Sequence, residues 1–182
     1  MTLEELKFDC AKKQKKGLHF ILSSALIWTL VLIVELSSLP ILTKNLLIFC
    51  CTVPLMPLSF AISKIIGVDF QNKDNPLSKL GLLFSINQIV YLLIAMWVFS
   101  AVPDKMLMVF AMIFGAHLMP YSWLYDSKSY LVLSILIPIV ALIVGLMLPA
   151  WSLAAIMVVI EILFSIFLSM ENKKNNTVKY AS

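Results

Sequence analysis

Six apolar stretches follow one another along this chain of 182 residues, and each has the length of about 20 residues that a helix needs to cross the roughly 30 Å hydrocarbon core of a bilayer. Hydrophobic residues make up 61% of the chain and charged residues 13%, whereas a water-soluble domain is about half apolar and about one quarter charged. The polar segments are too short to bury a core of their own, since that needs roughly 40 residues. The pattern predicts an all-α integral membrane protein, a helical bundle of six transmembrane helices.

The boundaries of these stretches divide the chain into three parts. Residues 1–17 are expected to form a short cytoplasmic amphipathic segment, residues 18–170 the six-helix transmembrane domain, and residues 171–182 a polar cytoplasmic tail. A short connection with a proline follows the first, third and fifth stretches, which favours three helical hairpins. The spans are expected near residues 18–36, 44–62, 80–101, 106–124, 130–148 and 151–170.

The basic residues indicate how the chain is threaded. All fourteen are lysines, and every one except Lys44 and Lys105 lies in the N-terminal segment, the second and fourth connections or the C-terminal tail. Short flanking segments rich in lysine stay in the cytoplasm. We therefore expect both termini to be cytoplasmic and the protein to lie in the plasma (inner) membrane of a bacterium. Arginine, which commonly binds phosphate through its planar fork, is absent, and no nucleic-acid partner is expected.

The first residues carry the signature of a helix start. Thr2 and Glu5 have the spacing of a capping box, in which each side chain binds the backbone amide of the other residue. Leu3, Leu6 and Cys10 then recur on one side of the expected helix, and a cluster of lysines follows. This pattern suits a short helix lying on an anionic lipid surface, although the interpretation that the lysines serve only to fix orientation is favoured.

Prolines inside the stretches predict irregular helices. Pro54 and Pro57 lie near the middle of the second stretch, where each ring displaces the carbonyl four residues before it. Pro120 and Pro138 are expected to break the fourth and fifth helices in the same way. Broken helices build the central binding sites of many transporters, but proline is also common in spans that are purely structural.

Polar side chains within the apolar stretches are the candidate functional residues, because an ionisable group in a bilayer is costly and is commonly functional. Glu161 lies in the middle of the sixth stretch and His117 in the fourth, while the third stretch has neighbouring amides at a similar depth. These residues are expected to form a central polar site able to relay protons or to hold a small cation or polar solute. The alternative is that they form interhelical hydrogen bonds. The five candidates are Glu161, His117, Gln88, Asn87 and Tyr91.

Small residues predict where helices approach one another closely. Ala111 and Gly115 form a small-xxx-small pair on the fourth stretch. The fifth stretch has a matching face of small or compact residues, formed by Ser134, Pro138, Ala141 and Gly145. We expect these faces to serve packing and to bind no ligand.

Metal, cofactor and catalytic signatures are missing from the sequence. Cys50 and Cys51 are adjacent in an apolar stretch, and no cysteine and histidine have the spacing of a zinc site. Phosphate-binding glycine loops, nucleophile elbows and paired-histidine protease motifs do not occur either. We therefore expect no metal, no cofactor and no enzymatic activity.

Four sequence features are notable together: the segment Phe114–Tyr125 of the fourth stretch, Lys16–Gly17, Trp28 and Asn75–Leu77. In these features the chain resembles an uncharacterised family of small bacterial multi-pass membrane proteins. The resemblance brings no known activity. It implies that His117 and the Pro120–Tyr121 turn belong to the family's most distinctive segment.

Two functions are consistent with these patterns. The first is transport or binding of a small solute or ion at the central polar site. The second is an accessory or interaction role, in which the spans pack against another membrane protein or against further copies of this chain. The expected partners are thus the lipid bilayer and either a small solute or cation, or a membrane-protein partner or homo-oligomer.

Overall fold

The computed structural model describes residues 1–70 and 72–178, and in these residues all regular structure is helical. Six segments are long and apolar enough to cross a membrane, as predicted. The capping box is also confirmed, because Thr2 and Glu5 each bind the backbone amide of the other. The helices are α1 (Leu3–Lys13), η1 (Lys15–Gly17), α2 (Leu18–Leu36), α3 (Ile41–Thr52), α4 (Leu55–Ile66), α5 (Leu77–Ala101), η2 (Pro103–Lys105), α6 (Met106–His117), α7 (Met119–Leu124), α8 (Lys128–Met147) and α9 (Ala150–Val178).

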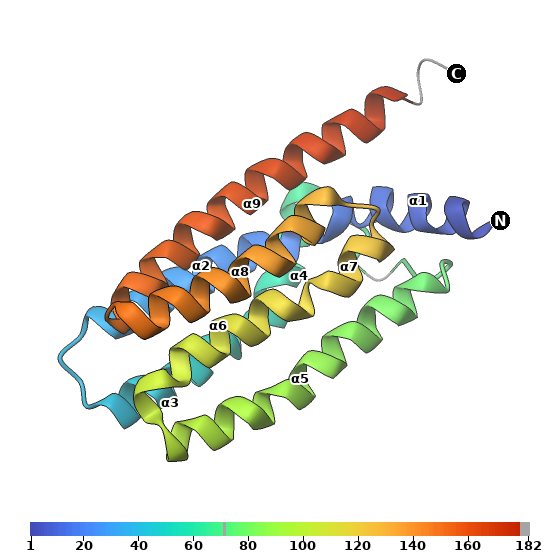
Figure 1. Ribbon diagram of the computed structural model, residues 1–182. Coiled ribbons are helices and arrows are strands. Elements are labelled where there is room, and N and C mark those ends of the chain that lie inside the picture. The colour runs from blue at the N-terminus through green and yellow to red at the C-terminus, as the bar shows by residue number, and fades with distance from the viewer. Residues whose placement is uncertain (71, 179–182) are drawn as a thin grey trace.

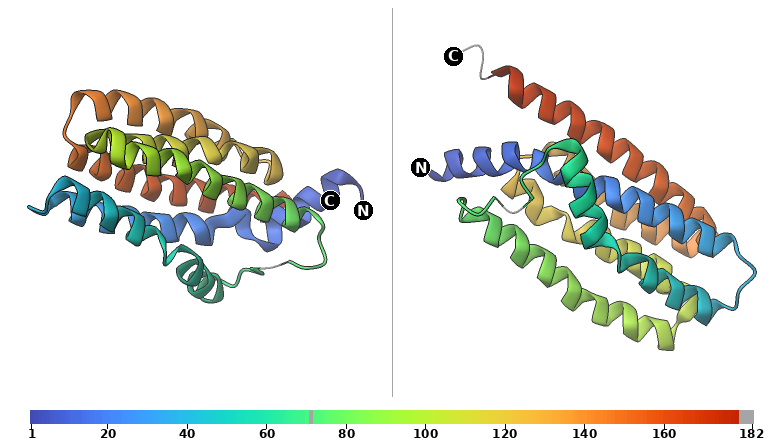
Figure 2. Two further views of the ribbon diagram at one scale, coloured as in Figure 1. Left: turned by 90° about the horizontal axis from the view of Figure 1, so that it is seen from below. Right: turned by 180° about the vertical axis from the view of Figure 1, so that it is seen from behind.

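The helices form one elongated bundle in which α1 and the end of α9 lie at the same end (Figures 1 and 2). We call this the lysine-rich end, and it also holds the α4–α5 and α7–α8 connections. The opposite end, here the outer end, holds the α2–α3, α5–α6 and α8–α9 connections. Within the bundle α2 packs on α9 and on α4, α6 packs on α8, and α5 packs on α6. Because six long segments run back and forth along the bundle, both ends of the chain lie at the same end of it.

The small-residue faces of the fourth and fifth stretches serve helix packing, as predicted, and the structure shows that they pack against each other, α6 on α8. Ala111 and Ala141 are completely buried between them. A methyl group added at Gly115 would lie 2.5 Å from Pro138 Cδ, and one added at Gly145 would lie 2.5 Å from Met108 Cγ. The two helices can approach this closely only because neither glycine has a side chain.

The predicted helix breaks occur at some of the prolines. The second span is interrupted at Val53–Pro54, between α3 and α4, and Pro57 lies in the first turn of α4, where a missing amide costs little. The fourth span is interrupted at Leu118, just before Pro120 in the first turn of α7. The break expected at Pro138 is absent, because α8 continues through it.

The C-terminal tail also differs from expectation. The polar sequence after residue 170 continues α9 as far as Val178. The expected polar tail 171–182 is therefore helical up to Val178, and its last four residues lie outside the described residues. Two polar residues of this extension, Glu171 and Asn172, bind other parts of the bundle.

Candidate functional site

A cavity of about 290 Å³ lies inside the bundle, between α2, α5, and the two interrupted spans. Val53, at the break between α3 and α4, and Leu118, at the break between α6 and α7, both line it. Most of its wall is apolar and aromatic. The Trp28 ring centroid lies 5.9 Å from that of Phe110 and 5.9 Å from that of Phe114. The cavity therefore lies where broken helices leave space between them.

Several hydroxyl groups in the wall are already hydrogen-bonded. Tyr121 Oη lies 2.7 Å from Ser85 Oγ and donates to the Gly81 carbonyl at 3.1 Å. Thr52 donates to the carbonyl of Phe49 in its own helix. These groups join α7 to α5 and complete the α3 terminus, and their protons are already donated to backbone carbonyls.

His117 and Gln88 add further hydrogen-bonding groups to the wall. The Nδ1 atom of His117 hydrogen-bonds the Phe114 carbonyl, and because a carbonyl oxygen only accepts, Nδ1 carries the proton. In the neutral ring Nε2 is then an acceptor. The Gln88 amide has no hydrogen bond to any described residue, and its side chain lines the cavity from α5. Together they supply an acceptor and an amide donor.

The wall carries no formal charge. Among the described residues that line the cavity there is no aspartate, glutamate or lysine. An ion held there would have to be desolvated without a partner of opposite charge, which is strongly unfavourable. The arrangement suits a neutral molecule with hydrogen-bonding groups.

Glu161 lies behind the wall and does not line the cavity. It is completely buried in α9, and neither carboxyl oxygen has a well-formed hydrogen bond to a described residue. The Ser24 hydroxyl interacts with this carboxyl, and Ser24 itself lines the cavity from α2. Glu161 is therefore next to the cavity wall and separated from the cavity by α2.

The structure divides the five residues predicted to form one site. His117 and Gln88 share the cavity, and Glu161 adjoins it through Ser24. Asn87 and Tyr91 do share a face of α5, but that face is exposed on the outside of the bundle. Successive helical residues differ by about 100° in direction, so the face that turns Gln88 inwards turns its neighbour Asn87 outwards.

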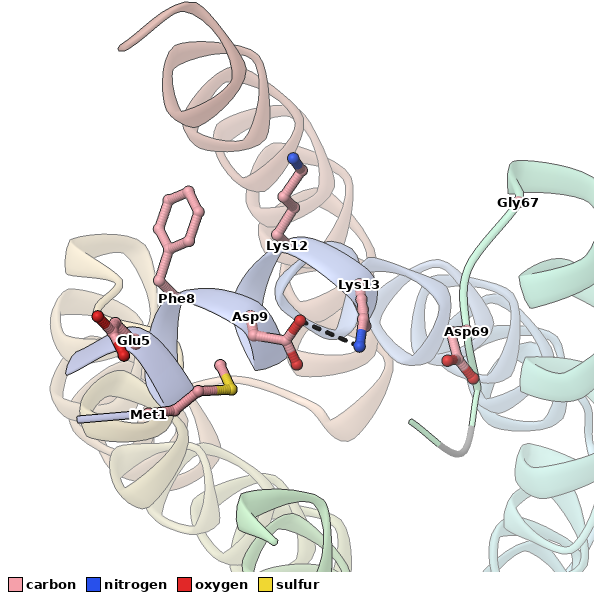
Figure 3. Close-up of a pocket in the computed structure, with 8 residues that line it drawn as sticks. All are labelled: Met1, Glu5, Phe8, Asp9, Lys12, Lys13, Gly67 and Asp69. Carbon is pink, nitrogen blue, oxygen red and sulfur yellow. Dashed lines mark ion pairs between the residues drawn. The ribbon is translucent and has the colours of Figure 1, made fainter. Parts of the chain in front are cut away.

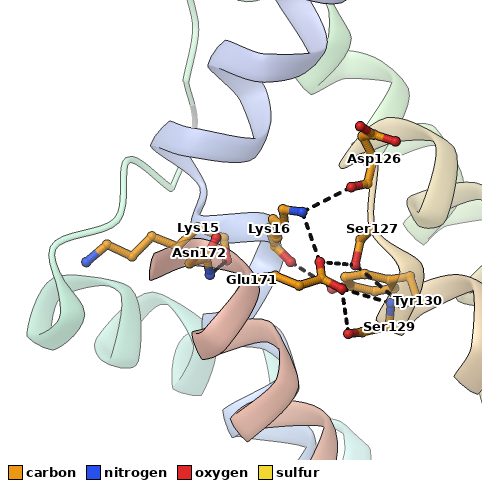
Figure 4. Close-up of polar contacts among 8 residues, drawn as sticks. All are labelled: Lys15, Lys16, Asp126, Ser127, Ser129, Tyr130, Glu171 and Asn172. Atoms are coloured by element: carbon orange, nitrogen blue, oxygen red, sulfur yellow. Dashed lines mark hydrogen bonds and ion pairs between the residues drawn. The ribbon is translucent and has the colours of Figure 1, made fainter. Parts of the chain in front are cut away.

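A polar network at the lysine-rich end was not predicted from the sequence (Figure 4). The buried Lys16 ammonium lies 2.9 Å from a Glu171 oxygen and donates to the Asp126 carbonyl at 3.0 Å. The same carboxylate accepts from Ser127 at 2.7 Å and from the Ser129 hydroxyl at 2.6 Å. This network joins the α1–α2 junction to the start of α8 and the end of α9. The sequence gives one indication of this network, because Glu171 is the single acidic residue among the lysines of the last segment.

The same junction closes one end of the cavity. Lys15, Lys16 and Gly17 all have positive φ, at 46°, 52° and 72°. Gly17 faces two tyrosines that line the cavity with it, and a methyl group there would lie 2.9 Å from Tyr130 Oη. Tyr130 donates to the Lys16 carbonyl at 3.0 Å. Tight packing of these groups separates the cavity from the lysine-rich end.

The helix α1 contacts α5 and α7, and an open groove with charged side chains lies beside it (Figure 3). On its predicted apolar side Leu3 is exposed, but Cys10 is completely buried, and burial raises the pKa of its thiol to about 11. Asp9 accepts hydrogen bonds from Asn75 at 2.9 Å and Asn72 at 3.3 Å and pairs with Lys13 at 3.1 Å. The open groove beside it carries charges of both signs.

The desolvation of Asp9 would by itself raise its pKa. The hydrogen bonds from Asn75, Lys13 and Asn72 outweigh that effect, so the pKa of Asp9 is lowered from its ordinary value of 3.8. The charged form of Asp9 is thus the one that holds α1 against the connection between α4 and α5.

Comparison with known proteins gives one match. Residues 3–171 match the model of a family described as a family of unknown function, DUF7010. No curated protein and no solved structure matches the chain.

Proposed function

The chain belongs to the DUF7010 family of unknown function, and we propose that it is a multi-pass membrane protein that binds a small solute within the bilayer, as the binding step of transport. The observation that carries this proposal is the cavity between the two interrupted spans, with His117 and Gln88 in its wall. Cavities at helix breaks are where many membrane transporters bind their substrates.

Membrane insertion is supported by the apolar outer surface of the bundle. Six segments have the required length and hydropathy, and many of their large apolar side chains are exposed, which in water would be a large aggregation-prone surface. Both α1 and the end of α9 lie at the lysine-rich end. By the positive-inside rule this end faces the cytoplasm, and we place the protein in the bacterial plasma membrane with both termini inside.

Thermal unfolding in lipid nanodiscs tests the binding proposal. A panel of amino acids, sugars, polyols, short alcohols and inorganic cations is added to the wild-type protein and to Gln88→Leu and His117→Leu variants. At least one solute is expected to raise the unfolding temperature of the wild type, because ligand binding to the folded state stabilises it. The shift is expected to disappear in both variants.

Asn87→Leu is the matched control, because Asn87 neighbours Gln88 on α5 but lies on the outside of the bundle. It is expected to retain the shift. Equal shifts in all four proteins would place binding outside the cavity, and no shift with any member of the panel would overturn solute binding as proposed.

A second function, association with another membrane-protein helix, is favoured by the exposed face of α5. Only Ala95 and Val98 are buried along its length, whereas Asn87 and Tyr91 expose polar groups near mid-helix. An amide is poorly solvated by lipid and commonly bonds a neighbouring helix. Analytical ultracentrifugation in detergent tests this role: Asn87→Leu is expected to reduce association, and a wild type that is monomeric and copurifies with no partner contradicts it.

A further inference from the structure

We propose that the cavity binds a neutral, single-chain amphiphile with a hydroxyl end group, which enters sideways from the lipid between α4 and α5. This inference rests on the proposed solute binding and adds the chemical class of the ligand and its route. Three features of the cavity carry it: where it opens, which polar groups are unused, and which charges are absent.

The opening is on the side of the bundle. Val53, Ile89 and Met56 line the cavity and yet are 77%, 64% and 51% exposed on the outer surface. Val53 belongs to the α3–α4 break, Ile89 to the middle of α5 and Met56 to the first turn of α4. Because α4 packs on α2 and α5 packs on α6, the cavity reaches the surface between these two pairs. At this depth the surrounding solvent is hydrocarbon if the bundle spans a bilayer.

Entry from the lysine-rich end is blocked. Gly17, Tyr125 and Tyr130 close the cavity there, and both tyrosine hydroxyls are engaged. Tyr125 donates to Gln14 Oε1 at 2.8 Å, and Tyr130 donates to the Lys16 carbonyl. A ligand therefore reaches the cavity most directly from the lipid, and such a ligand must itself dissolve in lipid.

The unused polar groups select a hydroxyl group. An O–H group both donates and accepts, so it can donate to His117 Nε2 while accepting from the Gln88 amide. The other side-chain hydroxyls around these two residues, those of Tyr121, Ser85 and Thr52, already have partners. An alkane would leave the hydrogen-bonding groups of His117 and of the half-buried Gln88 unused.

The absence of charge excludes the ionic amphiphiles. No aspartate, glutamate or lysine is among the described residues that line the cavity, so an ammonium or carboxylate head would be desolvated without a partner of opposite charge. The volume of about 290 Å³ lies just below the range of about 300–1,000 Å³ typical of pockets for drug-sized ligands. It accommodates the head and part of one chain and is too small for a two-chain lipid.

Photolabelling in nanodiscs tests this inference. The probe is 1-decanol with a diazirine near the middle of its chain, and labelled peptides are identified by mass spectrometry. Labelling is expected at cavity residues around Val53, Met56 and Ile89, in addition to lipid-facing background on other helices. Excess 1-decanol is expected to reduce the cavity labelling at least fivefold and to leave the background unchanged.

Two matched competitors separate the steps of the inference. Decane lacks the hydroxyl and decylammonium carries a charge, so at equal content in the bilayer neither is expected to compete. Competition by either one as strong as by 1-decanol would overturn the hydroxyl class while leaving a lipid-accessible cavity. Gln88→Leu and His117→Leu are expected to lose the labelling, and Asn87→Leu to keep it.

The failure of this inference is distinguishable from failure of the proposed function. Thermal shifts with water-soluble solutes, combined with no specific labelling by the decanol probe, would overturn entry from the lipid while solute binding stands. No thermal shift and no specific labelling would overturn both. The competition experiment uses the wild-type protein, so it decides the ligand class even where a cavity variant does not fold.

Discussion

The buried Lys16 side chain pairs with the Glu171 carboxylate, 155 residues later in the chain. This contact joins the start of the first span to the last helix. Glu171→Gln removes the negative charge and leaves the Lys16 ammonium buried beside the Asp126 carbonyl. Because charged hydrogen bonds are the strong ones and an unpaired buried charge is unfavourable, we expect the free energy of unfolding to fall by about 2–3 kcal/mol. Denaturation of the detergent-solubilised protein by SDS measures it.

Glu4→Gln is the matched control for that prediction. Glu4 also pairs with a lysine, Lys7, but at 3.9 Å and with 80% of the glutamate side chain exposed. Exposed pairs contribute little, so the change is expected to stay within about 0.5 kcal/mol of zero. Equal effects of the two substitutions would mean that the Lys16–Glu171 network does not stabilise the junction.

Asp9 makes the docking of α1 dependent on pH. Its pKa in the folded state lies below the ordinary value of 3.8, so the folded state stabilises the charged form. That contribution is fully present above pH 3.8 and is lost as the pH falls through the lowered pKa. Spin labels at Glu4 and Lys73 are expected to give a narrow distance distribution at pH 7, which broadens as the pH is lowered through the lowered pKa of Asp9.

Asp9→Asn separates this effect from other acidic groups near α1. The variant lacks the charge that Lys13 pairs with, so a broadened distribution is expected already at pH 7, with little further change on acidification. A pH response in Asp9→Asn as large as in the wild type would assign the transition to another group.

At the scale of the helices, the contact between α6 and α8 depends on one missing side chain. Gly115→Ala would place a methyl group 2.5 Å from Pro138 Cδ and 2.7 Å from Ile137 Cβ, so the two helices must separate. We expect a loss of about 1–3 kcal/mol in the free energy of unfolding, as for other overpacked sites. The same SDS titration measures it.

Gly81→Ala is the matched helical control. Its added methyl group would lie 3.3 Å from Leu124 Cδ2, the end of a flexible side chain that can move. Alanine is favoured over glycine in a helix by about 1 kcal/mol, so this variant is expected to be unchanged or slightly more stable. If Gly115→Ala behaved like Gly81→Ala, the close packing of α6 on α8 would be contradicted.

Features that depend only on residues close together in the sequence were predictable. The six long apolar segments, the capping box and the small-residue faces of α6 and α8 follow from length, spacing and residue size. The continuity of α8 through Pro138 was not predictable, because it depends on how neighbouring helices accommodate the proline. The helical extension of α9 beyond residue 170 likewise depends on contacts that Glu171 and Asn172 make with distant parts of the chain.

The site was predictable only in part, for a geometric reason. The sequence places Asn87 and Gln88 at one depth, but which of the two faces inwards depends on the rotation of α5 about its axis. That rotation is set by the packing of α5 on α6 and by the Tyr121–Ser85 contact with α7. Depth alone also grouped Glu161 with His117, although α2 with Ser24 lies between Glu161 and the cavity.

At the scale of the whole molecule, the arrangement of the ends and connections predicts a single threading through the membrane. The lysine-rich end, with α1 and the α7–α8 connection, is expected in the cytoplasm. The outer end, with the α2–α3 and α5–α6 connections, is expected on the opposite side. Lateral access to the cavity has meaning only if this threading is right, because it makes lipid the solvent at the opening between α4 and α5.

Cysteine labelling of intact cells with a membrane-impermeant maleimide tests this threading most directly. Single cysteines replace Lys12, Ser38, Asp104 or Asp126 in a chain whose three native cysteines are changed to serine. Ser38→Cys and Asp104→Cys are expected to be labelled in intact cells, and Lys12→Cys and Asp126→Cys only after the membrane is permeabilised. The reverse pattern, or labelling of all four positions in intact cells, would contradict a six-span bundle with both termini inside.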